Sequence, residues 1–146
     1  MDDVQRNIDV VKRLEQAYHA RDTDTIRASL AADFVAHTAG SDMLPPGVEG
    51  AIAANEGSFV SFPDKQTEIV EIFGDGDRVV SHVHMTGTND GGVAWANVPA
   101  NGKGVDFDWI QISRHGDDRK IVETWSQMDV ATMMQQLGAM QAPEGM

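Results

Sequence analysis

The chain has 146 residues, 41% of them hydrophobic, which suits one domain with a core of its own. With 11 Lys and Arg against 23 Asp and Glu, its formal net charge is −12, which disfavours nucleic acid and anionic membrane surfaces as partners. The sequence has no cysteine, so disulfides, thiolate metal sites and a cysteine nucleophile are excluded. Since it also has no spanning apolar run and no secretory leader, we expect a cytoplasmic protein.

The first half of the chain has mainly helical periodicity. Apolar residues three or four positions apart, starting at Val4, predict an amphipathic first helix that ends near Ala20. Asp22 is placed to cap a short second helix, and Pro63 is placed to end a third. The predicted helices cover residues 4–20, 23–31 and 48–62, and DFVAH predicts a short strand at 33–37.

After Pro63 the period changes from helical to alternating, which is typical of strands. Strands are predicted at 67–73, 78–88, 105–113 and 119–128, followed by a last helix at 130–137 that Asp129 caps and Gly138 ends. Helices first and antiparallel strands afterwards indicate an α+β fold, with helices on one face of a bent sheet and a hollow between them. We predict one domain over 1–146, with 139–146 as a loose tail.

Two histidines lie two residues apart in the predicted strand RVVSHVHMTGT. Alternation gives His82 and His84 the same face, and Val79, Ser81, Val83 and Met85 the other. H-x-H is a metal-ligand spacing, although the sequence offers no supporting ligand cluster. The Val79 face can instead be the buried one, which leaves the histidines outside. The third alternative, on which we build, has both imidazoles lining the hollow as acid–base groups.

The strand VDFDWIQIS supplies a carboxyl group. Alternation places Asp108 with Ile110 and Ile112, and two isoleucines favour a buried face. Asp108 would then lie in the wall of an apolar space, where desolvation raises the pKa of a carboxyl and allows it to hold or take a proton near neutral pH. The alternative is an exposed aspartate at the strand end, and Asp106 fits that description better.

Other side chains are expected to line the hollow. Asn55 lies on the apolar stripe of the third helix, where it orients a ligand or ties down backbone. Trp125 is predicted as a wall, with core packing as its alternative, and Asp129 is interpreted as a helix cap. The predicted substrate-binding residues are Tyr18, His37, Asn55, Phe59, Trp125 and Gln127, with core packing the first interpretation of Tyr18 and Phe59.

The sequence resembles the SnoaL-like polyketide cyclase family of the nuclear transport factor 2-like superfamily, to which ketosteroid isomerase and limonene epoxide hydrolase also belong. The motifs FPD, GDRV, GT-x-x-G, GK-x-V, E-x-W and QLG recur in order, and the resemblance runs from the first helix to Gly138. It implies a cone, with three helices packed into the concave side of a strongly curved antiparallel sheet, a short C-terminal helix and a deep apolar pocket. This superfold hosts many chemistries, so the motifs specify the fold more than the reaction.

The resemblance also carries catalytic positions. In epoxide hydrolase relatives a charged catalytic pair matches His82 and His84, and in ketosteroid isomerase the oxyanion-stabilising aspartate matches Asp108 and a pocket tryptophan matches Trp125. The departures are that Leu14 stands where the isomerase has a tyrosine, that histidines replace the hydrolase's arginine and aspartate, and that Gln127 replaces its further aspartate. Neither reaction carries over intact.

We therefore expect an isomerase, cyclase or lyase that needs no cofactor and no metal and acts on a bulky hydrophobic small molecule. Aldol cyclisation, isomerisation and a lyase or dehydratase step are the candidate reactions, with Asp108, His84 and His82 as acid–base residues. The alternative is a non-catalytic module that binds a small molecule or dimerises. A homodimer is expected from the resemblance, through an outer sheet face that includes some of Val79, Val83 and Met85.

Overall fold

The structure is a computed structural model that describes residues 2–141, so most of the predicted tail lies outside the described residues. The helices are α1 (Asp3–Ala20), α2 (Thr23–Ser29), α3 (Gly47–Ser61) and α4 (Val130–Gln136), with short 3-10 turns at Ser41–Met43 and Ala94–Ala96. The strands are β1 (Leu30–His37), β2 (Gln66–Asp75), β3 (Arg78–Thr88), β4 (Gly104–His115) and β5 (Ile121–Met128). Every helix and strand expected from the sequence is present.

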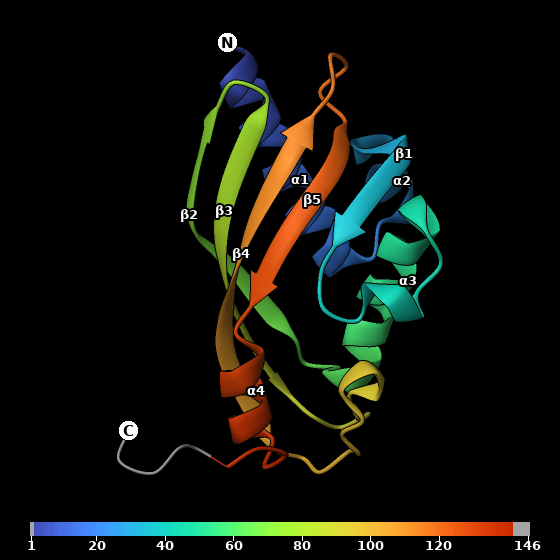
Figure 1. Cartoon of the computed structure of the whole chain (residues 1–146), viewed down its shortest axis with the longest axis vertical. Helices are drawn as coiled ribbons and strands as arrows, with labels where there is room; N and C mark the ends of the chain where they lie inside the picture. The colour runs from blue at the N-terminus through green and yellow to red at the C-terminus, as the bar shows by residue number, and fades with distance from the viewer. Residues whose placement is uncertain (1, 142–146) are drawn as a thin grey trace.

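The strands form one sheet in the order β1-β5-β4-β3-β2. Helices α1, α2 and α3 cover one face of this curved sheet, and the other face is uncovered in Figure 1. The α+β fold predicted from the sequence is thereby confirmed. One detail differs: β1 pairs with β5 in parallel, whereas the remaining pairs are antiparallel. Because α2 leads directly into β1 and most of the chain separates β1 from β5, this pair is not constrained by a hairpin.

Aspartates cap three of the helices. The carboxylates of Asp2, Asp22 and Asp129 accept hydrogen bonds from backbone N–H groups in the first turns of α1, α2 and α4. These bonds satisfy N–H groups that have no partner within the helix. The capping roles predicted for Asp22 and Asp129 are confirmed. The second helix is shorter than predicted, because Leu30 already belongs to β1.

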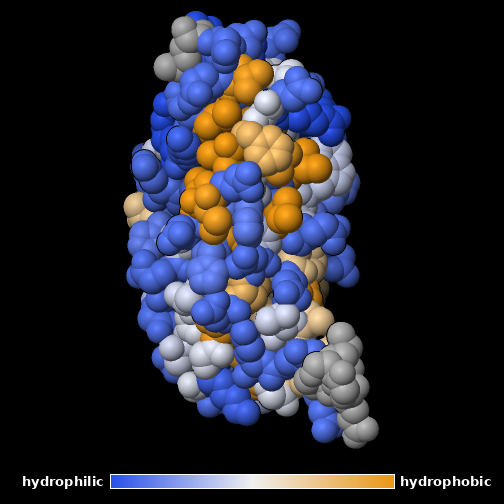
Figure 2. All heavy atoms as spheres, turned by 90° about the vertical axis from the view of Figure 1, so that its left-hand side faces the viewer, coloured by the Kyte–Doolittle hydropathy of each residue, from blue (hydrophilic) through white to orange (hydrophobic). Residues whose placement is uncertain are grey.

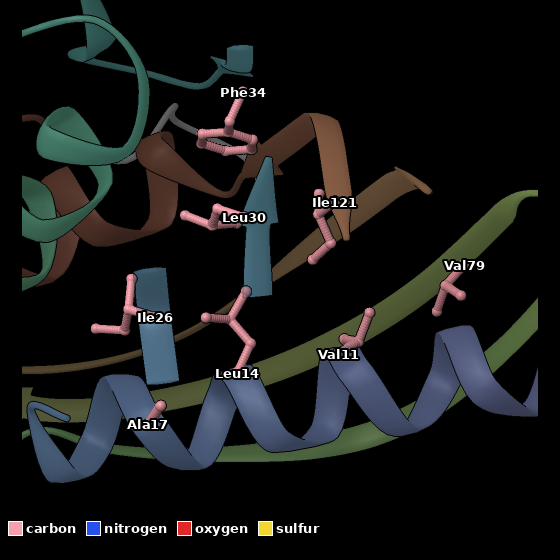
Figure 3. Close-up of a cluster of buried hydrophobic side chains, with 8 residues drawn as sticks. All are labelled: Val11, Leu14, Ala17, Ile26, Leu30, Phe34, Val79 and Ile121. Atoms are coloured by element: carbon pink, nitrogen blue, oxygen red, sulfur yellow. The ribbon is translucent and has the colours of Figure 1, made fainter. Parts of the chain in front are cut away.

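A hydrophobic core joins the helices to the sheet. Figure 3 shows apolar side chains from α1, α2, β1, β3 and β5 pointing toward one another: Val11, Leu14, Ala17, Ile26, Leu30, Phe34, Val79 and Ile121. A second cluster lies at the other end of the sheet, where Met133 and Leu137 pack with Met85 and Phe107. The two clusters fix the helices against the concave face at both ends.

The exposed fractions of the side chains show which face of β3 is buried. Val79, Ser81, Val83 and Met85 are each at most 4% exposed. The alternative that this face is buried is therefore correct. The expectation that Val79, Val83 or Met85 belongs to an outer dimer surface is wrong, because the helical layer already covers them.

No helix of residues 2–141 is long and apolar enough to cross a membrane.

Candidate active site

A cavity of about 210 Å³ lies between the helices and the concave face of the sheet. Tyr18 and Asn55 line it, as the sequence predicts. Most of the surface of its wall is apolar, with Leu14, Leu30, Phe34, Trp109 and Met128 among the contributors. Its polar groups include Glu15, Tyr18, Asn55, Ser58, Lys65 and Gln111. Mostly apolar concave sites with a few converging polar groups are typical of small-molecule binding.

Three of the side chains that line this cavity have shifted pKa values. Burial raises the pKa of the Glu15 carboxyl, and the positive charge of Lys65 opposes that rise. Burial also raises the pKa of the Tyr18 phenol, to which the charge of Glu15 adds. Burial lowers the pKa of Lys65 to about 8, against an opposing effect of Glu15. The pKa values of Glu15 and Lys65 are thus shifted toward neutral pH, where groups can exchange protons with a substrate, whereas the Tyr18 phenol keeps its proton.

Hydrogen bonds link Lys65 to the helices that enclose the cavity. The Lys65 Nζ donates to Ser58 Oγ at 2.7 Å, and the Ser58 hydroxyl donates to the carbonyl oxygen of Asn55 at 2.7 Å. The Asn55 amide in turn donates to the carbonyl oxygen of Tyr18 at 2.9 Å. Asn55 therefore holds the backbone of α1 by a hydrogen bond, which is one of the two roles expected of it. The Lys65 amino group is held in position by Ser58.

Phe59 contacts Lys65 but is not part of the cavity wall. The Lys65 Nζ lies 4.4 Å from the centroid of the Phe59 ring, and the guanidinium carbon of Arg21 lies 4.2 Å from the same centroid. The Phe59 side chain is 7% exposed. Its first interpretation as a core residue is the one that fits, although the ring also places two cations near each other.

The histidines and Asp108 come together, but not in the cavity. Register pairs His84 with Asp108 and His82 with Ile110, whereas the β4 residues that line the cavity are Trp109 and Gln111. Because side chains alternate along a strand, Asp108 and both histidines point away from the cavity, to the outer face. The expectation that they line the hollow is wrong.

The two isoleucines explain this error. Ile110 and Ile112 are 50% and 36% exposed, so they belong to an uncovered face and not to the core. Their hydrophobicity reflects an apolar outer surface, which a sequence cannot distinguish from a buried one by alternation alone. Asp108 shares that surface.

The electrostatics of Asp108 are also opposite to those expected. Its carboxylate accepts hydrogen bonds at 2.6 Å from His82 Nε2 and from His84 Nδ1, and the second His84 nitrogen lies 3.1 Å from Asp106 Oδ1. The bonds from His82 and His84 lower the pKa of Asp108, and the bond to Asp108 raises the pKa of His84. Asp108 is thus an ionised partner of histidine, not a desolvated acid.

Three more predicted pocket residues lie on the outer face. Trp125 pairs with Ile112, Gln127 pairs with Ile110, and the cavity-lining residues of β5 are their neighbours Thr124, Ser126 and Met128. His37, at the end of β1, stacks on Trp125 with 5.6 Å between ring centroids. It also donates from Nε2 to Glu123 at 2.7 Å, a bond that lowers the pKa of Glu123. The predicted contacts of Trp125, Gln127 and His37 with a ligand in the hollow are therefore wrong.

Sequence reasoning missed most residues of the cavity, among them Glu15, Lys65, Trp109 and Gln111. One signal was available for Glu15, which lies four residues after Val11 and three before Tyr18, on the apolar stripe of α1. Another was available for Trp109, because it shares its parity with Val105 and Phe107. Lys65 follows a helix end and has no pattern around it that indicates burial. Among residues 2–141, no group of three or more His, Asp or Glu side chains is arranged to hold a metal ion.

The chain belongs to the SnoaL-like polyketide cyclase family, whose model matches residues 8–137. The resemblance drawn from its motifs is thereby confirmed. Comparison with curated proteins gave no match. Family membership supports a small-molecule enzyme related to the cyclases, and the geometry of the cavity is consistent with that class.

Solved structures share the fold. TsrD from Streptomyces laurentii superimposes with a TM-score of 0.83 at 21% identity, over 96% of this chain and 99% of that one. IdmH, a putative polyketide cyclase from Streptomyces antibioticus, is 29% identical with a TM-score of 0.75, over 90% of this chain and 98% of that one. A putative polyketide cyclase from Bacillus cereus ATCC 10987 is 27% identical with a TM-score of 0.76, over 92% and 82% of the two chains.

Proposed function

We propose that the chain is a cofactor-free acid–base enzyme that acts on an apolar carbonyl compound in the cavity, by an aldol cyclisation of the polyketide-cyclase type. Isomerisation and a lyase or dehydratase step need the same groups and are the neighbouring possibilities. The observation that carries the proposal is the convergence of Glu15, Tyr18 and Lys65 in one apolar cavity. The names of the similar structures, which include putative polyketide cyclases, agree with this substrate class.

Each of the three groups has a role in such a reaction. Glu15, with its raised pKa, is a strong enough base to take a proton from a carbon next to a carbonyl. The negative charge that then develops on the carbonyl oxygen is stabilised by donors that are already in place. The Lys65 ammonium and the Tyr18 hydroxyl are such donors at the cavity wall. Gln111 accepts a hydrogen bond from Ser126 at 3.1 Å, which leaves its amide N–H groups available to a substrate oxygen.

The first test compares wild type with Glu15→Gln on a panel of polyketide-like, steroid-like and aromatic ketones, followed by retention time and mass. Retention is needed because cyclisation and isomerisation leave mass unchanged. Loss of a general base typically costs about 10²–10⁴-fold in rate, so Glu15→Gln should lose turnover by that factor while it still binds the compound. Binding without conversion by both proteins would favour the non-catalytic alternative. Equal conversion by both would remove Glu15 from the mechanism.

We further propose that the outer sheet face is the surface of a homodimer. Phe73, Val80, Ile112 and Trp125 lie in one row across β2, β3, β4 and β5, and apolar side chains gather on the β2 side of the molecule in Figure 2. Arg78 and Arg114 lie toward one end of β3 and β4, and Asp106 and Asp108 toward the other.

A dimer of this kind has a two-fold axis that runs along the apolar row and crosses the strands. Such an axis places the apolar row of one copy on that of the other, with the strands of the two copies running in opposite directions. The expected cytoplasmic location, and the expected lack of nucleic-acid and membrane partners, stay predictions from composition and charge.

A further inference from the structure

Lys65 differs from the other lysines of the chain. The sequence has four, and Lys12, Lys103 and Lys120 are exposed or half-buried, whereas Lys65 is 8% exposed. Lysine is among the residue types that are almost never fully buried unless paired. No carboxylate among the described residues lies within ion-pair distance of Lys65, and its burial against the cavity therefore calls for an explanation.

The amino group of Lys65 has unused hydrogen-bonding capacity. Among the described residues its one hydrogen-bond partner is Ser58, although an ammonium group has three N–H donors. The Ser58 hydroxyl hydrogen is already donated to Asn55, so the Ser58 oxygen acts toward Lys65 as an acceptor that fixes its position. The remaining positions around the nitrogen are left for a molecule in the cavity.

Burial is the main reason why Lys65 favours its neutral form. The Arg21 guanidinium and the Lys65 Nζ both lie within 4.4 Å of the Phe59 ring centroid, and the charge of Arg21 lowers the pKa of Lys65 in addition to burial. The charge of Glu15 acts in the opposite direction and has a larger effect than that of Arg21, but burial outweighs it. Desolvation together with a neighbouring cation is one of the ways in which proteins activate a lysine as a nucleophile.

We propose that Lys65 is a covalent catalyst, whose amino group forms an imine with a ketone or aldehyde carbon of the substrate. This inference rests on the proposed function, since it concerns the same cavity and the same class of carbonyl substrate. It replaces purely electrostatic stabilisation by Lys65 with a carbon–nitrogen bond.

The steps balance without an oxidant or reductant. The lone pair of the neutral amine attacks the carbonyl carbon, and the carbonyl oxygen takes protons and leaves as water, which gives an iminium ion. The Glu15 carboxylate takes a proton from the adjacent carbon, and the electrons of that C–H bond move into the iminium to form an enamine. The enamine carbon attacks a second carbonyl of the same substrate, whose oxygen is protonated. Water then hydrolyses the iminium and frees Lys65.

The test traps the bond directly. Wild type, Lys65→Arg and Lys65→Met are incubated near pH 7 with heptanal and sodium cyanoborohydride, which reduces an iminium to a stable amine, and in parallel with acetylacetone, which condenses with a neutral amine. Intact mass gives the number of adducts, and a peptide map locates them among the four lysines. Circular dichroism of each variant checks that it is folded, and urea-unfolded wild type shows the intrinsic reactivity of all four lysines.

The pKa of about 8, against 10.5 for an ordinary lysine, gives Lys65 roughly 300-fold more neutral amine at pH 7. We expect one early lysine adduct, on Lys65, formed at least about tenfold faster than on the exposed lysines once slower access to a cavity is allowed for. The terminal amine has an ordinary pKa of about 8, so its adduct is identified separately in the peptide map. The Lys65 adduct should be absent from Lys65→Arg. The preference should disappear in urea. Adducts on Lys12, Lys103 and Lys120 at rates equal to or above that of Lys65 in the folded protein would overturn the proposal.

Turnover separates this proposal from the proposed function. Lys65→Arg keeps a positive donor but cannot form the imine. If Lys65→Arg converts the substrate at the wild-type rate while Glu15→Gln does not, acid–base catalysis stands and the covalent step is refuted. If Glu15→Gln is also fully active, the proposed function falls as well. Loss of turnover in Lys65→Arg together with selective trapping on Lys65 supports both.

Discussion

The amide of Asn55 donates a 2.9 Å hydrogen bond to the carbonyl oxygen of Tyr18, which joins α3 to the last turn of α1 beside the cavity. Asn55 is 7% exposed, so water cannot readily replace this bond. The Tyr18 carbonyl also accepts from the backbone N–H of Arg21 at 3.2 Å, near the point where α1 ends. One side-chain amide thus fixes how two helices meet at the candidate site.

Asn55→Ala should destabilise the fold by about 1–2 kcal/mol, because a buried hydrogen bond is lost while the carbonyl keeps its second partner. The midpoint of urea unfolding measures the change. Glu56→Gln, at the exposed neighbouring position of α3, serves as the control and should leave the midpoint unchanged. An Asn55→Ala midpoint equal to that of wild type would show that the bond contributes nothing.

Lys65 should make stability depend on alkaline pH. Its pKa falls from 10.5 to about 8 on folding, so between these values the unfolded chain binds more protons and folded-state stability rises with pH. Below pH 8 the folded protein bears the full free-energy cost of burying the Lys65 charge. This cost disappears as pH approaches 10.5, which raises the free energy of unfolding by at most roughly 3 kcal/mol.

The measurement is urea unfolding of wild type and Lys65→Met at several pH values. We expect the stability of wild type relative to the variant to increase between pH 8 and pH 10.5. Comparison with the variant cancels the effect of the chain's large negative charge, which acts on both proteins. A difference that stays constant over this range would mean that Lys65 keeps an ordinary pKa.

The cluster that Asp108 forms with His82 and His84 on the outer face should stabilise the fold most at mildly acidic pH. The His84 pKa is raised, so its contribution to stability is fully present below the unfolded value of 6.5 and is lost as pH rises through the folded pKa. The Asp108 pKa is lowered, so its contribution is present above 3.8 and is lost as pH falls through the folded pKa. The stability that Asp108→Asn removes should therefore be largest between about pH 4 and 6.5 and should shrink in high salt.

An NMR titration of the histidine rings tests the same cluster. Asp108→Asn removes the main cause of the raised His84 pKa, so His84 should titrate at lower pH than in wild type. His115, which is buried and bonded to the Arg119 carbonyl, provides an internal control. We also expect turnover of a cavity substrate to be kept in Asp108→Asn. A His84 titration unchanged by the substitution would contradict the bonding pattern.

The outer face should control association. Phe73→Glu or Ile110→Glu places a charge within the proposed two-fold surface, where its copy lies close by, so each should convert a dimer to a monomer in sedimentation velocity. Phe73 and Ile110 are 53% and 50% exposed. Val60→Glu is the matched control, since Val60 is 64% exposed but lies on α3, on the opposite layer. A wild type that is monomeric at all concentrations would refute the proposed dimer.

The sequence predicted the elements well because caps, turns and periodicity are local signals. The prediction of which face of β4 is buried was wrong for a physical reason: both faces of this strand carry apolar residues. Ile110 and Ile112 lie on one face, and Val105, Phe107 and Trp109 on the other. Alternation identifies two sets but not which set is inside. The buried set becomes evident only when β3 is considered with it, since Val83, which is fully buried, lies opposite Trp109.

The candidate site was predictable only in part. Tyr18 and Asn55 lie on helical stripes whose buried side follows from their neighbours, and both line the cavity. Lys65 reaches it from the short link between α3 and β2, where no periodicity applies. Its environment includes Glu15 and Arg21, which are distant in sequence, and such an environment arises only from the tertiary fold.

The alternation of β4 has a consequence for directed evolution. Trp109 and Gln111 touch the cavity, and their neighbours Asp108, Ile110 and Ile112 lie on the opposite surface. A library randomised at the odd-numbered positions of this stretch would vary substrate preference, and one randomised at the even-numbered positions would vary self-association. The proposed substrate preference and the proposed self-association can thus be varied independently within five consecutive codons.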